Sequence, residues 1–311
     1  MKLPEPKIYV IYENPSWIPT FKAAFEKANI PYAFWNLTDL DVDISQPPPV
    51  GIFWNRMSPS YWLRNGHETL DKAKVVISWL LTYGRRVING SEGVGMELSK
   101  LQQYAALQSC GVTVPPTVPI YGPSGLHRAE KSIRQLQFPV IVKPNCGGKG
   151  AKIEKFETYE EVVQYVNGYD FTEAPDRIIL VQQFVPSAQP WITRAEFIGG
   201  KFMYALRINN QQGFELCPAD ACAKDGIKLF WIEKGMANNL IISKLESFMA
   251  KFSLDIAGIE FVEDDQGDSY VYDVNLNTTY NSAAEKEAEV YSGVEQFTEL
   301  LQLELDEISA E

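Results

Sequence analysis

A glycine-rich turn at residues 143–150 carries residue types that hold phosphate groups. In VKPNCGGKG, Lys143 ends an apolar segment and Lys149 stands inside the turn. Pro144 stops the strand, while the glycines permit backbone angles and close approaches that side chains block. Such a turn can fold over phosphates and present N–H groups and a lysine to them. The pattern indicates a phosphate-binding turn or an ordinary hairpin, and it excludes a Walker A loop because the GxxxxGK[ST] spacing is absent.

A second group of polar residues lies in the segment GIEFVEDDQGDSYVYDVN, near the C-terminus. Glu260 stands on one predicted strand, and Asp273 and Asn275 stand on the next. Because strand residues alternate between faces, Asp273 and Asn275 share one face. Oxygen ligands on one face suit Mg²⁺, which keeps several waters and is completed by substrate phosphates. A solvated acidic hairpin is the alternative, and the charged EDDQGD tip favours it.

A third candidate is the segment FWNRMSPSYWLRNGHE, at residues 53–68, which follows a predicted strand. In an open α/β sheet, ligands bind in the loops beyond the carboxyl ends of the strands. The segment also concentrates cations in an acidic chain. We therefore expect a substrate loop whose arginines select a carboxylate, with a simple packing loop as the alternative. The residues expected to contact the substrate are Asn55, Arg56, Ser58 and Arg64.

Alternating strand-like and helix-like segments must position these residues. In the first third of the chain they favour a parallel α/β sheet with helices on both faces. Expected strands are 7–13, 32–37, 50–55 and 85–89, expected helices are 15–30 and 67–84, and the proline-rich residues 41–50 form a linker. A helix that stops at Gly111 follows. A composition change at 120–126 marks an expected domain boundary. The rest of the chain contains mostly strands and hairpins, with helices near 127–137, 158–168 and 237–252.

The composition limits the classes of protein. A chain of 311 residues with 45% hydrophobic and 22% charged residues is typical of a soluble globular protein. Its net charge of -12 argues against a nucleic-acid partner, which requires a basic face. No segment approaches the roughly 20 apolar residues that cross a bilayer, so we expect a cytoplasmic protein without a membrane partner. The four cysteines are scattered, which favours reduced thiols, and the two histidines exclude a three-histidine zinc site.

The order of these motifs resembles the ATP-grasp superfamily and, within it, the RimK-like carboxylate–amine ligases. The resemblance covers nearly the whole chain: an α/β domain, a GxxxxELSK helix, the VKP and GGKG hairpin, a VQQF hinge, and the GIE and DVN strands. It implies an ATP-grasp fold with an N-terminal parallel α/β domain and an α+β C-terminal part. The expected domains are an N-terminal domain at 1–122, a small subdomain with the phosphate loop at 123–186, and a C-terminal subdomain with the metal site at 187–311.

The resemblance also implies where ATP binds. Lys100 and Lys143 match the lysines that bind the nucleotide phosphates, and the turn adds Gly147, Gly148, Lys149 and Gly150. The hinge for the adenine base would be Gln182, Gln183, Phe184 and Val185, whose backbone groups read the base edge. The sequence departs from the family here, because the usual Gln-Glu pair of the hinge is Gln-Gln. A carboxylate contact is therefore missing.

The resemblance assigns the remaining site residues as well. Arg194 and Arg207 match arginines that grip a carboxylate or an acyl-phosphate oxygen, a task that suits the forked guanidinium. Glu260, Asp273 and Asn275 match the metal ligands, with an aspartate at 273 where the family has a glutamate. The expected cofactors are ATP and Mg²⁺, with Mn²⁺ as a possible substitute.

The function that the resemblance implies is ATP-dependent amide-bond formation. A substrate carboxylate attacks the γ-phosphate, and an amine then displaces phosphate from the acyl-phosphate. This chemistry depends on positioning and charge neutralisation and requires no protein nucleophile. The expected substrates are small-molecule or peptide carboxylates and amines. Two alternatives stay open: an ATP-grasp kinase of a hydroxyl group, and a non-catalytic ATP-binding regulator, which the altered hinge favours.

Overall fold

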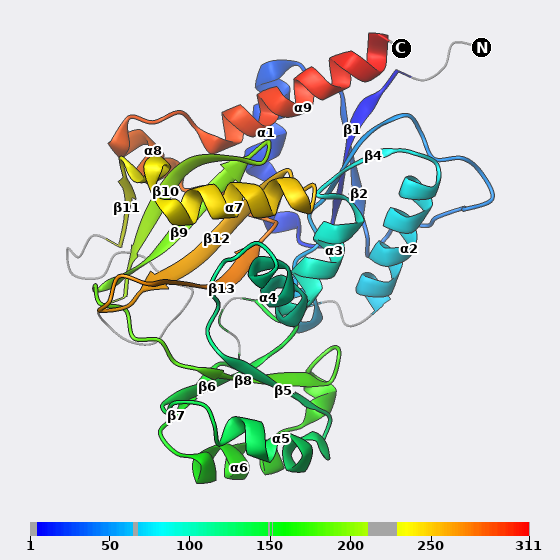
Figure 1. The fold of residues 1–311 in the computed structure, drawn as a ribbon. Helices are drawn as coiled ribbons and strands as arrows, with labels where there is room; N and C mark the ends of the chain where they lie inside the picture. Colours follow the sequence, from blue (N-terminus) through cyan, green and yellow to red (C-terminus); the bar gives the residue numbers. More distant parts are fainter. Residues whose placement is uncertain (1–4, 65–67, 149, 151, 211–228, 311) are drawn as a thin grey trace.

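The computed structural model describes residues 5–64, 68–148, 150, 152–210 and 229–310. Within these ranges the strands form three sheets, a parallel N-terminal sheet, a small sheet and a large sheet. Figure 1 shows the small sheet below the other two. In the same ranges no helix combines the length and apolar character needed to span a membrane.

The N-terminal sheet confirms the predicted parallel α/β domain. Its strand order is β2-β1-β3-β4, and every pair is parallel. The central strand β3 is buried throughout, as a strand covered on both faces must be. The proline-rich segment 41–50 contains no helix or strand, as predicted. The elements of this region are β1 (Lys7–Tyr12), η1 (Pro15–Trp17), α1 (Pro19–Ala28), β2 (Tyr32–Asn36), β3 (Gly51–Asn55), η2 (Tyr61–Leu63), α2 (Glu68–Thr82), β4 (Arg86–Ile88), α3 (Gly90–Leu98) and α4 (Lys100–Gln108).

The small sheet has the order β5-β8-β6-β7, and its neighbouring strands are antiparallel. The glycine-rich turn connects β6 to β7, so the predicted hairpin is present. Helix α6 begins at a capping box in which Thr158 and Glu161 exchange side-chain and backbone hydrogen bonds. The sheet includes β5, which precedes the boundary predicted at residue 122. Its elements are β5 (Thr117–Tyr121), α5 (Gly125–Ile133), β6 (Val140–Pro144), β7 (Glu154–Phe156), α6 (Tyr159–Gly168), η3 (Phe171–Glu173) and β8 (Ile178–Gln183).

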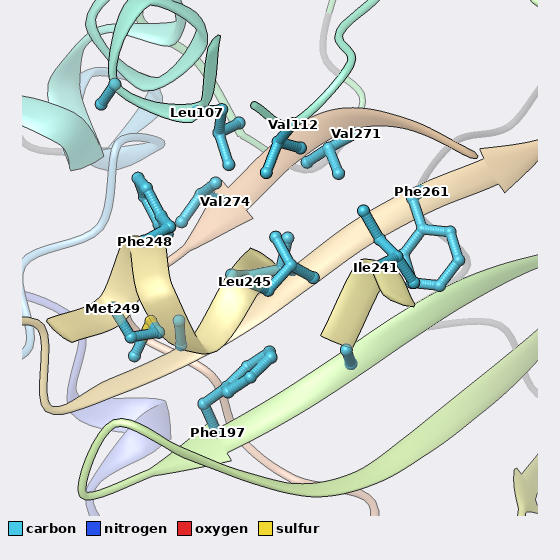
Figure 2. Packing of buried hydrophobic residues seen from close by; sticks show 14 of the residues in the cluster. Leu107, Val112, Phe197, Ile241, Leu245, Phe248, Met249, Phe261, Val271 and Val274 are labelled. Atoms are coloured by element: carbon cyan, nitrogen blue, oxygen red, sulfur yellow. The ribbon is translucent and has the colours of Figure 1, made fainter. Parts of the chain in front are cut away.

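The large sheet is antiparallel, with the order β11-β10-β9-β12-β13. Helix α7 covers one face, and Figure 2 shows its Leu245 and Phe248 among side chains of the strands and of the α4 region. This apolar layer fixes the sheet that carries the predicted metal ligands. The elements are β9 (Trp191–Ile198), β10 (Lys201–Asn209), β11 (Phe230–Glu233), η4 (Met236–Asn238), α7 (Leu240–Lys251), β12 (Ile256–Glu263) and β13 (Ser269–Asn275).

Two C-terminal helices complete the fold, α8 (Ser282–Ala288) and α9 (Gly293–Ala310). Helix α9 packs against the N-terminal sheet as well as against the large sheet (Figure 1). Its Phe297 contacts Trp54 of β3, with ring centroids 4.8 Å apart. Arg86 of β4 adds ion pairs to Asp255 and to Glu304 of α9. The C-terminal subdomain at residues 187–311 stays a prediction. Its last helix, α9, packs with the N-terminal sheet.

Candidate active site

A cavity of about 160 Å³ lies between the N-terminal region, the glycine-rich turn and the large sheet. A Cβ placed on Gly148 would lie 3.5 Å from Pro59 and Ser60, so the turn packs against the N-terminal loop. The cavity brings together eight of the residues predicted from the sequence: Ser58, Lys100, Gly147, Gly148, Arg194, Glu260, Asp273 and Asn275. Lys149 lies outside the described residues, as do two of the four cysteines, Cys217 and Cys222.

Lys100 is held at the break between α3 and α4. Ser99 has an extended backbone and caps α4 by accepting a hydrogen bond from the Gln102 N–H. The Lys100 N–H donates to the Asn145 carbonyl at 3.1 Å, and its Nζ forms an ion pair with Asp273. Burial lowers the pKa of Lys100, but the attraction of Asp273 and other nearby groups outweighs this effect and raises the pKa above its ordinary value. Lys100 therefore stays cationic in the cavity wall.

Lys143 is a buried ammonium without a carboxylate partner among the described residues. It lies in β6, next to the last residue of the strand, with 2% of its surface exposed, and its Nζ lies 5.6 Å from the ring centroid of Tyr104. Burial, assisted by repulsion from Lys100, lowers the pKa of Lys143 to about 7. A charged ammonium group is costly to bury unless an anion lies beside it. Lys143 is not among the residues that line the cavity, and its role at a phosphate group stays a prediction.

Arg194 is fixed in the cavity by three partners on the large sheet and the segment after it. Its Nε lies 2.8 Å from Glu196, its Nη1 lies 3.5 Å from Glu260, and its Nη2 donates to Thr278 at 2.6 Å. The guanidinium lies over Gly258, where a Cβ would come within 2.5 Å of Nε. Gly258 therefore provides the space that Arg194 occupies.

The predicted metal ligands come from two paired strands. Glu260 lies directly opposite Asp273 in the register of β12 and β13, and Asn275 follows two positions later on the same face. Burial raises the pKa of Glu260 to about 7, against the opposing effect of Arg194. Across the described ranges, no three Asp, Glu, His or Cys side chains group closely enough to hold a metal ion. Two carboxylates and an amide fit Mg²⁺, which takes its other oxygens from water and phosphates.

Arg207 lies away from this cavity. It pairs with Thr193 across β9 and β10, whereas Arg194 pairs with Leu206, so the two arginines point to opposite faces of the sheet. The Arg207 guanidinium approaches Glu263 at 3.5 Å and Glu233 at 3.9 Å. Its assignment to the substrate stays a prediction.

The predicted hinge connects the small sheet to the large sheet and does not line the cavity. The N–H groups of Gln183 and Phe184 donate to the carbonyls of Pro116 and Pro139 at 2.9 and 3.0 Å. The side chain of Gln182 donates to Thr117 Oγ1 at 2.8 Å. These groups are engaged within the small sheet. The assignment of Gln182, Gln183, Phe184 and Val185 to the adenine base stays a prediction.

The N-terminal loop reaches the cavity through Ser58, whereas its arginines lie in packed positions. Arg56 is 0% exposed and donates to the carbonyls of Asn277 and Thr278 at 3.5 and 3.1 Å. Arg64 forms an ion pair with Glu13 at 2.5 Å. Neither arginine lines the cavity, because both are directed into protein contacts, and their assignment to the substrate stays a prediction. Asn55 is buried and accepts a hydrogen bond from the Met57 N–H. Gly150 is exposed, with a left-handed φ of 66°.

The cavity also contains residues that the sequence analysis did not single out: Trp17, Pro59, Glu97, Gln103, Val274, Asn277 and Thr279. Two of them stand beside recognised motifs. Glu97 precedes Lys100 by three positions in ELSK, and Asn277 follows Asn275 by two positions in DVNLN. Their spacing from the predicted ligands Lys100 and Asn275 is the signal that could have identified them.

Comparison with known proteins identifies the family. A model described as a RimK-like ATP-grasp domain matches residues 98–301. The chain belongs to the RimK-like ATP-grasp family. The match contains every cavity residue from Lys100 onward, but it leaves Trp17, Ser58, Pro59 and Glu97 outside.

Individual relatives are distant. The "Uncharacterized protein MG012 homolog" of Mycoplasma pneumoniae (strain ATCC 29342 / M129 / Subtype 1) is 28% identical over 155 residues, which are 47% of this chain. The matched part is 51% of that relative, so the chain spans about half its length. The D-cycloserine synthetase DcsG has a TM-score of 0.67 at 16% identity, covering 96% of this chain and 99% of that one. The ATP-grasp ligase PsnB, complexed with minimal precursor, Mg and ADP, has a TM-score of 0.64 at 15% identity, covering 96% and 97%. At these identities the two structures establish the fold alone.

Proposed function

We propose that this protein is an ATP-dependent carboxylate–amine ligase that forms an amide or peptide bond and releases ADP and phosphate. The observation that carries the proposal is the cavity in which Lys100 and Arg194 face Glu260, Asp273 and Asn275 beside the glycine-rich turn. Cations and metal-binding oxygens at one position suit the transfer of a phosphoryl group. Membership in the RimK-like family, and the fold shared with ATP-grasp ligases, support the same reaction class.

Each residue then has a role that its environment supports. Lys100, Lys143 and the turn bind the phosphates of ATP, since Lys143 is buried without an anionic partner among the described residues. Glu260, Asp273 and Asn275 hold Mg²⁺, or Mn²⁺ in its place. When bound, the metal neutralises phosphate charge and polarises the transferred group. Arg194, fixed by Glu196 and Thr278, orients the substrate carboxylate.

The proposed reaction has two steps. A carboxylate oxygen of the substrate attacks the γ-phosphorus, and ADP leaves with the electrons of the broken bond. An amine then attacks the acyl carbon, and phosphate leaves. The substrates are small-molecule or peptide carboxylates and amines. PsnB, whose structure contains minimal precursor with Mg and ADP, and the D-cycloserine synthetase support this range of substrates.

An ADP-release screen over amino acids and peptides, with mass spectrometry of the products, tests the proposal. ADP release that depends on an added amine and yields an amide supports a ligase. Release with a polyol, and phosphate on its hydroxyl group, would instead identify a kinase. Tight ATP binding without turnover would identify a regulator, for which the Gln182–Gln183 hinge is the supporting feature.

Mg-ATP is expected to stabilise the folded protein. At about 100 times its dissociation constant, a ligand that binds only the native state adds roughly 2.7 kcal/mol to the free energy of unfolding. Thermal unfolding with Mg-ATP, and with ATP plus a chelator, measures the effect. A Lys143→Met variant is the control, since it removes the buried ammonium and retains an apolar stem. An unchanged midpoint for the wild-type protein at saturating Mg-ATP contradicts the proposed nucleotide site.

Replacing Gly258 with alanine is expected to slow turnover about tenfold or more. The new Cβ would stand 2.5 Å from Arg194 Nε, so the guanidinium must move out of its present position. Gly168→Ala is the matched control, because a Cβ at Gly168 meets no atom within 4 Å. Comparable kinetics for the two variants would show that the position of Arg194 over Gly258 is not important for the reaction.

A further inference from the structure

We propose that Glu97 and Asn277 form the binding site for the amine substrate, and that Glu97 accepts the proton that the amine must lose before it attacks. The proposal rests on the ligase function and deepens it, because it assigns the second substrate to named residues. Neither residue has a role in the phosphate, metal or carboxylate sites described above. Glu97 also lies outside the segment that matches the family model.

The first observation is the pairing of charges in the cavity. Asp273 pairs with Lys100, and Glu260 pairs with Arg194. Glu97 also lines the cavity, is 5% exposed, and forms no ion pair with any residue in the described part of the chain. Lys100 and Arg56 act on it only through space. A buried carboxylate beside a cavity and without a cation in contact is suited to a cationic ligand.

The second observation concerns Asn277, which lines the same cavity and is 8% exposed. Its Nδ2 donates to the Met57 carbonyl at 2.8 Å, and its side chain lies close enough to Glu97 to lower the pKa of that carboxyl. Its Oδ1 is buried and accepts no hydrogen bond from the described residues. The Glu97 carboxylate and the unpaired Asn277 Oδ1 are both hydrogen-bond acceptors, so a ligand that binds them must supply hydrogen-bond donors. An ammonium group carries three N–H donors and no acceptor, so it fits this pair.

The anchoring of Glu97 favours an amine over a second metal. The Leu276 N–H donates to Glu97 Oε2 at 2.8 Å and holds the carboxylate in place. Glu97, Glu260 and Asp273 do not form a metal-binding group within the described ranges. Burial raises the pKa of Glu97 to about 7, against the opposing effects of Leu276 and Asn277. A carboxylate in this range can accept a proton from an ammonium and release it afterwards.

The proton balance of the step is complete. The substrate ammonium gives one proton to Glu97, which leaves a nitrogen lone pair free to attack the acyl carbon. The carbon–nitrogen bond forms, and the carbon–oxygen bond to phosphate breaks with its electron pair on the oxygen. The second proton leaves the nitrogen with the departing phosphate as hydrogen phosphate. Glu97 then returns its proton to solvent.

The test compares two nucleophiles on one acyl-phosphate. N-acetyl amino acids and N-acetyl peptides serve as carboxylate probes, and amino-acid amides serve as amine probes. Hydroxylamine is the second nucleophile, because it is largely uncharged at neutral pH and needs no base to free its lone pair. In Glu97→Gln we expect amide formation to fall about ten- to a hundredfold, with hydroxamate formation within about twofold of wild type. Glu97→Asp should recover part of the amide rate, because it retains the carboxylate.

Each result separates this proposal from the ligase function on which it rests. Glu92→Gln is the matched control, since Glu92 is exposed on the same helix α3. An equal loss of amide and hydroxamate in Glu97→Gln, or a loss of neither, overturns the assignment of Glu97 and leaves the ligase function standing. A wild-type protein that forms no hydroxamate from any probe overturns the ligase function and the amine site with it. Thermal midpoints near wild type identify the variants whose kinetics are interpretable.

Discussion

Replacing Asp273 with asparagine is expected to lower ADP release at least about a hundredfold, the range found when a charged or polar group aimed at a transition state is removed. Asp273 has two tasks in the cavity. It forms the ion pair with Lys100, and it lies opposite Glu260 in the proposed metal site. The asparagine keeps the shape and removes the charge. Lys100 then loses its partner, and the metal site loses one of its two carboxylates.

The measurement is steady-state ADP release as a function of Mg²⁺ concentration, together with Mg²⁺-dependent ATP binding by calorimetry. We expect a higher Mg²⁺ requirement in both experiments and an unchanged circular-dichroism spectrum, because no core volume is emptied. Asp265→Asn is the control, since Asp265 is exposed at the tip of the same hairpin. Wild-type rates in Asp273→Asn would place the metal elsewhere.

Replacing Arg56 with alanine is expected to lower the free energy of unfolding by about 3 kcal/mol, the range for removing a large buried side chain. The guanidinium is fully enclosed and lies 4.8 Å from the ring centroid of Trp54 and 5.1 Å from that of Phe21. It also donates to the carbonyls of Asn277 and Thr278. Alanine leaves a cavity among the rings and two carbonyls without their donor. Arg56 therefore connects the N-terminal sheet to the segment that follows the proposed metal site.

Urea unfolding of Arg56→Ala and Arg56→Met separates packing from charge. Burial lowers the pKa of Arg56 to about 10, which reports that its charge is poorly solvated. Methionine fills much of the volume without that charge, so we expect it to cost about 1 kcal/mol. Arg128→Ala, at an exposed position on α5, is the control. A loss of unfolding free energy below about 1 kcal/mol for Arg56→Ala, together with a raised substrate requirement, would instead support the predicted substrate role of Arg56.

The residues that could be predicted from the sequence are those whose chemistry is local. Lys143 ends an apolar strand before a glycine-rich turn, and Asp273 and Asn275 alternate along one strand, so short segments suffice to recognise them. Lys100 and Arg194 required the resemblance to a family. The structure then places Lys100, Arg194, Asp273 and Asn275 around the same cavity.

The residues that could not be predicted depend on contacts between distant segments. Arg56 follows a strand and has the spacing of a ligand-binding residue, but its partners lie 221 and 222 positions later in the chain. Nothing near Arg56 in the sequence shows that carbonyls at 277 and 278 will enclose it. Glu97 and Asn277 come together in the same way. Helix α9 is also missing from the expected elements, but for a different reason. Its Val294, Phe297 and Leu301 follow a helical spacing that is visible in the sequence, so local information is sufficient to predict it.

The most direct test of the central claim follows the oxygen atoms of the substrate. The protein is supplied with Mg-ATP, an amine and the carboxylate found in the screen, labelled with heavy oxygen in its carboxylate group. If the reaction passes through an acyl-phosphate, one labelled oxygen leaves with the phosphate, and mass spectrometry finds heavy inorganic phosphate in equal amount to the amide product. Amide formation with unlabelled phosphate, or phosphate retained on the substrate as a stable ester, would contradict the ligase mechanism.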